Sequence, residues 1–191
     1  MLKPVEAMSA FLVMIDIQER LMPAIFNKEE VTANSKKLLI SARELSIPVI
    51  VSEQNPKGLG ATIPELSEIL PEGSHTFQKN EFSCCDNPAF GDAFLNMRFT
   101  SGTTKDTAIV FGVETHICVL STVLHLLNDY GLNVVVAADA SGSRTEANHV
   151  LGLEALRSTG SLVVPSETVI YQLLRRAGTP EFKKLLPLFK Q

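Results

Sequence analysis

Short apolar runs recur along this chain, and each is separated from the next by a stretch with helical spacing. The runs are continuous rather than alternating, which is typical of strands buried on both faces of a parallel sheet. They are Ala10–Asp16, Ile47–Glu53, a weaker run at His75–Lys79, Ala108–Val113, Val134–Asp139 and Ser161–Pro165. Repeated strand–helix–strand order predicts an α/β fold with a doubly wound, mainly parallel six-stranded sheet and helices on both faces, in three layers like a Rossmann fold.

Capping signals mark where some of the intervening helices begin. Asn27–Glu30 has the spacing of a capping box, and we expect a helix from there to about Ser46. Ser143–Glu146 repeats that spacing and opens a helix to about Ser158. Thr115 is placed to cap a further helix over the residues that follow it. Three other segments have helical patterns: Asn87–Phe99, Thr168–Ala177 and Lys183–Phe189.

Length and composition indicate an ordinary globular protein. A chain of 191 residues suits a single domain over residues 1–191. The net charge of -4 and the absence of a basic block argue against a nucleic-acid partner. No apolar run approaches the roughly 20 residues of a membrane span, and the start of the chain lacks the core of a secretory signal. Three cysteines make no disulfide framework, which favours a reducing compartment, so we expect a cytoplasmic protein. We expect its partner to be a small molecule.

The strongest chemical signal is Cys118. An apolar run ends at Val113, and the helix that follows has Cys118 in its first turn. A thiol there is close to unpaired backbone N–H groups and to the positive end of the helix dipole. Both favour the thiolate, which is the nucleophilic form of cysteine. We therefore expect Cys118 to be reactive, with the thiolate favoured over the thiol.

Two charged residues stand at equivalent places on other strands. Asp16 and Lys79 follow their apolar runs at the carboxyl ends, which share one edge of a parallel sheet. A crevice there could join them to Cys118, with Asp16 moving protons and Lys79 stabilising negative charge. Taken singly, each residue has an ordinary alternative. Asp16 could serve a turn, Lys79 could be a solvated surface lysine, and Cys118 could be a small buried apolar residue.

Other histidines and cysteines are weaker candidates. His116 lies two positions before Cys118, so the two side chains would point to nearly opposite sides of a helix. His125 is two turns further on, about 10 Å away by helix rise. Cys84 and Cys85 are adjacent and match no zinc or redox spacing, although one of them could act as a redox partner of Cys118.

Four motifs in this order resemble the isochorismatase-like cysteine hydrolases, a family that includes nicotinamidases and N-carbamoylsarcosine amidases. MIDIQ carries Asp16 and Gln18, FQKNEFS carries Lys79, and GVETHICV carries Cys118. VVVAADASGSR, after the next strand, adds to the match. The resemblance runs from about Phe11 to Glu167.

This resemblance implies a catalytic triad of Asp16, Lys79 and Cys118. It also implies a cis peptide bond between Val113 and Glu114, which composition alone does not indicate. The backbone N–H groups of Glu114 and Cys118 would then form an oxyanion hole for a tetrahedral intermediate. The family forms homo-oligomers, so the same is implied here.

The chain departs from the nicotinamidases after its second apolar run. Those enzymes carry a metal-binding Asp-x-His there, whereas this chain has Ser52-Glu53-Gln54-Asn55. We therefore expect no catalytic metal and no cofactor. The residues expected to line the substrate pocket are Gln18, Gln54, Phe82 and Thr115.

These features predict a metal-independent cysteine hydrolase that cleaves a small-molecule amide or a related C–N bond through a thioester. Some family members cleave a vinyl ether instead, because a scaffold does not fix the reaction. Two other interpretations stay open: a non-catalytic binding or assembly protein on the same fold, and a thiol-redox protein.

Overall fold

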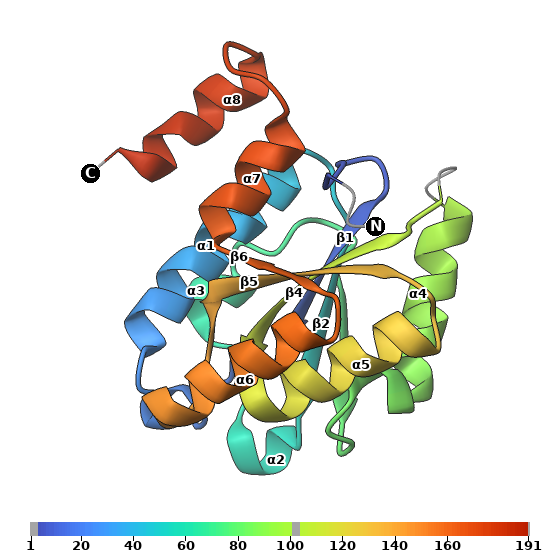
Figure 1. Cartoon of the computed structure of the whole chain (residues 1–191), viewed down its shortest axis with the longest axis vertical. Coiled ribbons are helices and arrows are strands. Elements are labelled where there is room, and N and C mark those ends of the chain that lie inside the picture. Colours follow the sequence, from blue (N-terminus) through green and yellow to red (C-terminus); the bar gives the residue numbers. More distant parts are fainter. Residues whose placement is uncertain (1–3, 101–103, 191) are drawn as a thin grey trace.

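A parallel sheet forms the centre of the molecule (Figure 1). The computed structural model describes residues 4–100 and 104–190. The strands are β1 (Ala10–Ile15), β2 (Val49–Gln54), β3 (His75–Lys79), β4 (Thr107–Val113), β5 (Asn133–Gly142) and β6 (Leu162–Val164). They lie in the order β3-β2-β1-β4-β5-β6, and every neighbouring pair is parallel. The predicted doubly wound six-stranded sheet is therefore confirmed.

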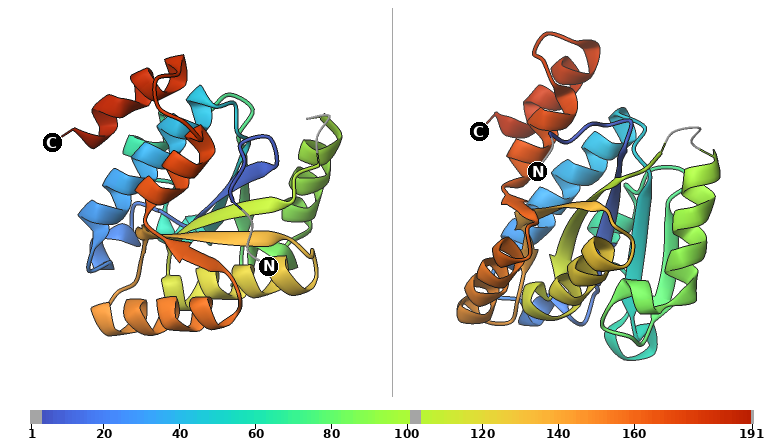
Figure 2. Two further views of the ribbon diagram at one scale, coloured as in Figure 1. Left: turned by 45° about the horizontal axis from the view of Figure 1, so that its top comes forward. Right: turned by 45° about the vertical axis from the view of Figure 1, so that its right-hand side comes forward.

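Helices cover both faces of this sheet (Figure 2). They are α1 (Lys28–Glu44), α2 (Pro56–Leu59), α3 (Pro64–Ser67), α4 (Pro88–Thr100), α5 (Leu120–Asn128), α6 (Glu146–Ser158), α7 (Ser166–Leu174) and α8 (Pro180–Leu185). Short 3₁₀ turns lie at Met22–Ala24, Cys84–Asp86 and Leu186–Phe189. The left view of Figure 2 separates α1 and α7 on one face from α5 and α6 on the other. Within the described part of the chain, no helix is long and apolar enough to cross a membrane.

The two faces of the sheet bury two separate apolar clusters. Leu12 and Met14 of β1 join the cluster beneath α1 and α7, whereas Phe11 and Val13 of the same strand join the cluster beneath α4, α5 and α6. Because successive side chains of a strand point to opposite faces, a strand covered on both sides must be apolar throughout. This explains why the strands of this chain read as continuous apolar runs.

Two of the expected helix caps are wrong, although the helices they announced are present. Asn27 precedes α1, but its side-chain amide donates to the Ser141 carbonyl instead of capping the helix. Helix α6 is capped by Thr145, whose hydroxyl accepts from the Asn148 N–H, and not by Ser143. The end of β5 thus takes up the Asn27 amide, while the Ser143 hydroxyl lies 3.0 Å from His116 Nδ1.

The sheet changes direction between β1 and β4. From β1 the chain runs outward through β2 to β3, and from β4 it runs the other way through β5 to β6. In open α/β sheets ligands bind at this switch point, outside the carboxyl ends of the strands. Asp16 directly follows β1, Lys79 ends β3, and Cys118 follows β4. The fold thus brings the three candidate catalytic residues to one edge of the sheet.

Candidate active site

A buried ion pair lies at the centre of the site. The Lys79 ammonium donates to Asp16 Oδ2 at 2.7 Å, and both side chains are almost completely buried. Asp16 adopts a left-handed backbone conformation with φ of 52°, a region that Asp and Asn enter more readily than most residues. The strand therefore turns sharply at Asp16, directly where its carboxylate meets Lys79.

Every polar atom of this pair has further partners. Lys79 Nζ also donates to Gln54 Oε1 at 2.6 Å and to the Glu81 carbonyl at 3.2 Å, so its three protons are used. The other oxygen of Asp16 accepts from the Ser52 hydroxyl at 2.7 Å. A role for Ser52 was not predicted from the sequence. Its position near the end of β2, the strand next to β1, is the feature that could have indicated one. Burial of two charges requires such saturation, because an unpartnered buried charge is costly.

Cys118 lies on a wide π turn, Thr115–Val119, that links β4 to α5. We call Glu114–Val119 the Cys118 turn. Cys118 is only 7% exposed, and its thiol is close enough to Asp16 for the two groups to shift each other's pKa values. Burial and the Asp16 charge raise the pKa of the thiol to about 12, although Lys79 acts in the opposite direction. The expectation of a favoured thiolate is therefore wrong: desolvation and the carboxylate outweigh the helix end, and the resting group is a neutral thiol.

The two charged partners also have shifted pKa values. Burial raises the pKa of Asp16 above its ordinary 3.8, against the lowering effects of Lys79 and Ser52. Burial lowers the pKa of Lys79, but the adjacent Asp16 carboxylate more than reverses this, so the pKa of the ammonium is raised. Lys79 thus stays charged, while Asp16 holds a proton more readily than an exposed carboxylate does. Such a carboxylate is suited to take up a proton and return it.

The backbone around Cys118 is held by the loop after β5. The peptide bond between Val113 and Glu114 is cis, as the family resemblance implied. Thr115 does not cap a helix: its hydroxyl donates to the Gly142 carbonyl at 2.9 Å and lies 2.9 Å from His149 Nδ1. Thr115 is fully buried and bonded internally, and its place in a substrate pocket stays a prediction. Sequence reasoning also missed His149 as the partner of Thr115, because nothing in the spacing links the two.

The other expected pocket residues occupy three different environments. Gln18 is buried, and its amide bonds the backbone of Gln54 and the Gly60 carbonyl, which ties the loop after β2 to β1. These bonds give Gln18 a role in positioning the loop, and its contact with a substrate stays a prediction. Gln54 is half-buried and holds Lys79 while donating to the Asn80 carbonyl. Phe82 is 63% exposed, on the surface beyond β3.

The remaining thiols and histidines do not contact the Cys118 sulfur through any hydrogen bond of the described residues. His125 Nδ1 lies 2.7 Å from the Ser83 hydroxyl. Cys84 is completely buried, and burial raises the pKa of its thiol to about 11. All three cysteines are free thiols. Among the described residues, no group of three or more potential metal ligands gathers at one point.

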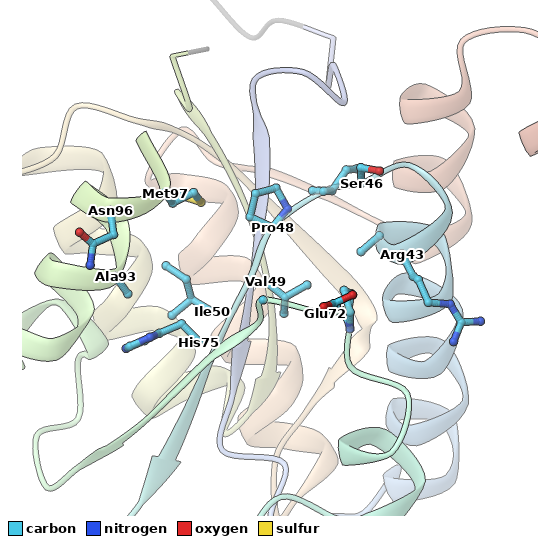
Figure 3. A pocket seen from close by; sticks show the side chains of 14 residues that line it. Arg43, Ser46, Pro48, Val49, Ile50, Glu72, His75, Ala93, Asn96 and Met97 are labelled. Atoms are coloured by element: carbon cyan, nitrogen blue, oxygen red, sulfur yellow. The ribbon is translucent and has the colours of Figure 1, made fainter. Parts of the chain in front are cut away.

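Two cavities lie away from the triad. One, of about 640 Å³, opens at the amino ends of β2 and β3. Figure 3 shows Arg43 and Asn96 on opposite sides of it, with the Arg43 side chain directed away. Its polar groups do not converge as they do in a specific ligand site. The other cavity, of about 670 Å³, lies between the start of the chain and α7.

Comparison with known proteins supports one family. The isochorismatase domain model matches residues 10–168. Isochorismatase domain-containing protein 2A of Mus musculus is 33% identical over 183 residues, which cover 96% of this chain and 84% of that protein. The structure of MAR1 ribonuclease from Caenorhabditis elegans is 34% identical with a TM-score of 0.89, covering 98% of this chain and 92% of that one. YcaC from Pseudomonas aeruginosa, with hexane-2,5-diol and covalent acrylamide, is 25% identical with a TM-score of 0.85, covering 97% and 91%.

The family match and the fold therefore agree with each other and with the order of the motifs. The matched residues include every strand and the residues Asp16, Lys79 and Cys118. The chain belongs to the isochorismatase domain family and has the family's hydrolase fold.

Proposed function

We propose that this chain is a cysteine hydrolase that cleaves a small-molecule amide or a related C–N bond, with Cys118 as nucleophile, Asp16 as proton carrier and Lys79 as the fixed positive charge. One observation carries the proposal: the Cys118 thiol, the buried Asp16 carboxylate and the Lys79 ammonium paired with it are close enough that each acts on the pKa of the others. A purely structural cysteine has no need of such a costly buried pair.

In the first step the sulfur attacks the carbonyl carbon of the substrate. Because the pKa of the thiol is about 12, a neutral thiol must lose its proton as the new S–C bond forms. Asp16 is the carboxylate that interacts with the thiol, and we assign it as the acceptor of that proton. Lys79 stays charged throughout and keeps the surroundings of Asp16 electrically balanced. The nucleophile is thus activated at the moment of attack.

Negative charge then develops on the carbonyl oxygen of the substrate. The backbone N–H groups of Glu114 and Cys118 are the donors we assign to that oxygen. Removing a single donor of such a site typically costs about 10²- to 10³-fold in rate. Asp16 next returns the proton to the departing amine, and a thioester on Cys118 remains. Water activated by Asp16 releases the acid and restores the thiol.

We assign no metal to this reaction, on the basis of the donors that the chain offers. The segment at the end of β2 that would supply metal ligands, Ser52-Glu53-Gln54-Asn55, has no histidine. Its carboxylate, Glu53, already accepts from the Thr62 N–H at 2.7 Å and from the Thr62 hydroxyl at 2.9 Å. Full activity in the presence of a chelator is the expected result.

Other substrates are outcomes of the same test. The MAR1 neighbour is described as a ribonuclease, but the net charge of -4 gives this chain no general affinity for a polyanion. A vinyl ether could be cleaved by the same proton carrier. A binding protein would retain the site and show no turnover. Self-association of the chain stays a prediction, to be measured by light scattering.

A panel of small amides, ureas, vinyl ethers and single-stranded RNA tests the proposal with three proteins. The wild type should hydrolyse one or more amides, and Cys118→Ala should lose that activity. Cys85→Ala is the matched control, since its half-buried thiol has no bond to the ion pair; it should retain full rate. Mass spectrometry should find an acyl group on Cys118 during turnover. Equal rates in Cys118→Ala and the wild type would remove the nucleophile.

A further inference from the structure

Three consecutive side chains of the Cys118 turn are bonded to one other segment, the loop after β5 and the start of α6. The Glu114 carboxylate accepts from the Arg144 backbone N–H at 2.8 Å and from its Nε at 3.0 Å. Thr115 bonds the Gly142 carbonyl and His149. His116 Nδ1 lies 3.0 Å from the Ser143 hydroxyl.

The bond between Thr115 and His149 has a defined direction. The Thr115 hydroxyl has one proton, and it donates that proton to the Gly142 carbonyl. Its oxygen can then only accept from His149, which must carry its proton on Nδ1. His149 is half-buried on the first turns of α6 and packs against the Phe26 ring. The imidazole therefore acts as a fixed donor beneath the backbone that precedes Cys118.

Close packing of α6 onto the same turn adds a second constraint. A side chain at Gly152 would lie about 3.0 Å from the His116 backbone nitrogen, tighter than most real contacts. Gly152 therefore lets α6 lie directly on the Cys118 turn. Side-chain bonds on one side and helix packing on the other leave the turn little freedom to shift.

We propose that His149 is a positioning residue, which acts through the Thr115 hydroxyl to hold the backbone N–H groups of Glu114 and Cys118 where an oxyanion forms. This inference rests on the proposed hydrolysis at Cys118. His149 touches neither the sulfur nor the reacting carbonyl. Its loss should slow only those reactions of Cys118 in which a carbonyl oxygen becomes negatively charged.

Two probes of Cys118 separate that role from a general loss of structure. p-Nitrophenyl acetate acylates the sulfur: the S–C bond forms, the bond to p-nitrophenolate breaks, the thiol proton passes to Asp16, and an oxyanion exists on the way. Iodoacetamide alkylates the same sulfur by displacing iodide, and no oxyanion is formed. Rates measured on Cys118→Ala are subtracted, so that the other two thiols do not contribute.

The variants remove or retain the donor at one position. His149→Leu removes it, whereas His149→Asn places an amide N–H where Nδ1 stood. We expect acylation to slow by about 10- to 100-fold in His149→Leu, as for small misplacements of catalytic groups, and to recover most of its rate in His149→Asn. The rate of alkylation by iodoacetamide should change by less than about twofold in both variants, because that reaction forms no oxyanion.

Thr115→Val and Thr115→Ser repeat the comparison from the other side of the bond, so the proposal is tested even where one variant does not fold. Thr115→Val should slow acylation as His149→Leu does. The double variant Thr115→Val/His149→Leu should be acylated no more slowly than Thr115→Val alone, because both changes remove the same interaction. Equal slowing of both probes, or no slowing of acylation, would overturn the positioning role. Unchanged reactivity of Cys118→Ala would instead refute the proposed function.

Discussion

Replacing Lys79 by Met should destabilise the protein by an amount that depends on pH. At an effective dielectric constant of about 20, two unit charges 2.7 Å apart attract by roughly 6 kcal/mol. Asp16 limits the loss by taking up a proton in the folded variant. Keeping a proton at pH 7 on a group with an ordinary pKa of 3.8 costs about 4 kcal/mol, at 1.36 kcal/mol per pH unit. We therefore expect the free energy of unfolding to fall by about 4 kcal/mol at pH 7.

The sign of the pH dependence follows from the same reasoning. In Lys79→Met the pKa of Asp16 is raised in the folded state, so the unfolded chain releases this proton first as the pH rises. Stability from the neutral carboxyl is then present below the ordinary pKa and is lost as the pH increases. At pH 5 the penalty should shrink to about 1.6 kcal/mol.

Urea unfolding followed by far-ultraviolet circular dichroism measures this, since the chain has no Trp. Asp16→Asn combined with Lys79→Met is the control. Its amide is neutral at both pH values, and Asn tolerates the left-handed conformation at this position. The double variant should lose the extra pH dependence. A cost for Lys79→Met under about 1 kcal/mol at both pH values, as for exposed ion pairs, would refute the reasoning.

Two further predictions concern the thiol and the strand beside it. The difference in thiolate absorbance between wild type and Cys118→Ala should show no ionisation step below pH 9, because the pKa of this thiol is raised from 9.0 to about 12. The stability that the buried thiol contributes is lost only as the pH rises from 9 toward 12. An ionisation step near pH 7 would show that the resting group is a thiolate. Gly112→Ala should cost at least about 2 kcal/mol of unfolding free energy and most of the activity, because φ is +125° and a Cβ would clash with the Ile15 carbonyl beside Asp16. Gly131→Ala, with φ of +62° and open space around it, is the control and should lose about 1 kcal/mol with activity intact.

The sheet could be predicted from the sequence because its physical signal is local. Strands buried on both faces must be apolar at every position, as β1 is, and the run expected at Ala10–Asp16 contains that strand. Helix caps failed for the opposite reason. Asn27 and Ser143 have suitable side chains, but distant groups compete for them: the Ser141 carbonyl for the first and His116 for the second.

The meeting of three residues at one edge of the sheet was predictable, whereas the electrostatics of the site were not. Strand order places Asp16, Lys79 and Cys118 at one edge, and the motifs name the same residues. The protonation state of the Cys118 thiol depends on how deeply it is buried and on the carboxylate of Asp16, which lies 102 residues earlier in the chain. The bond from Thr115 to His149 likewise joins elements that only the folded structure brings together.

The left-handed turn at Asp16 has a consequence for how such a protein could change over generations. Asn is the other common residue that accepts this conformation, and it differs from Asp by one oxygen and one nitrogen atom. Exchange of a single nucleotide converts any Asp codon into an Asn codon. With Asp16 as the proposed proton carrier, one mutation would abolish that transfer while the strand still turns as before, a short route from catalyst to silent binder.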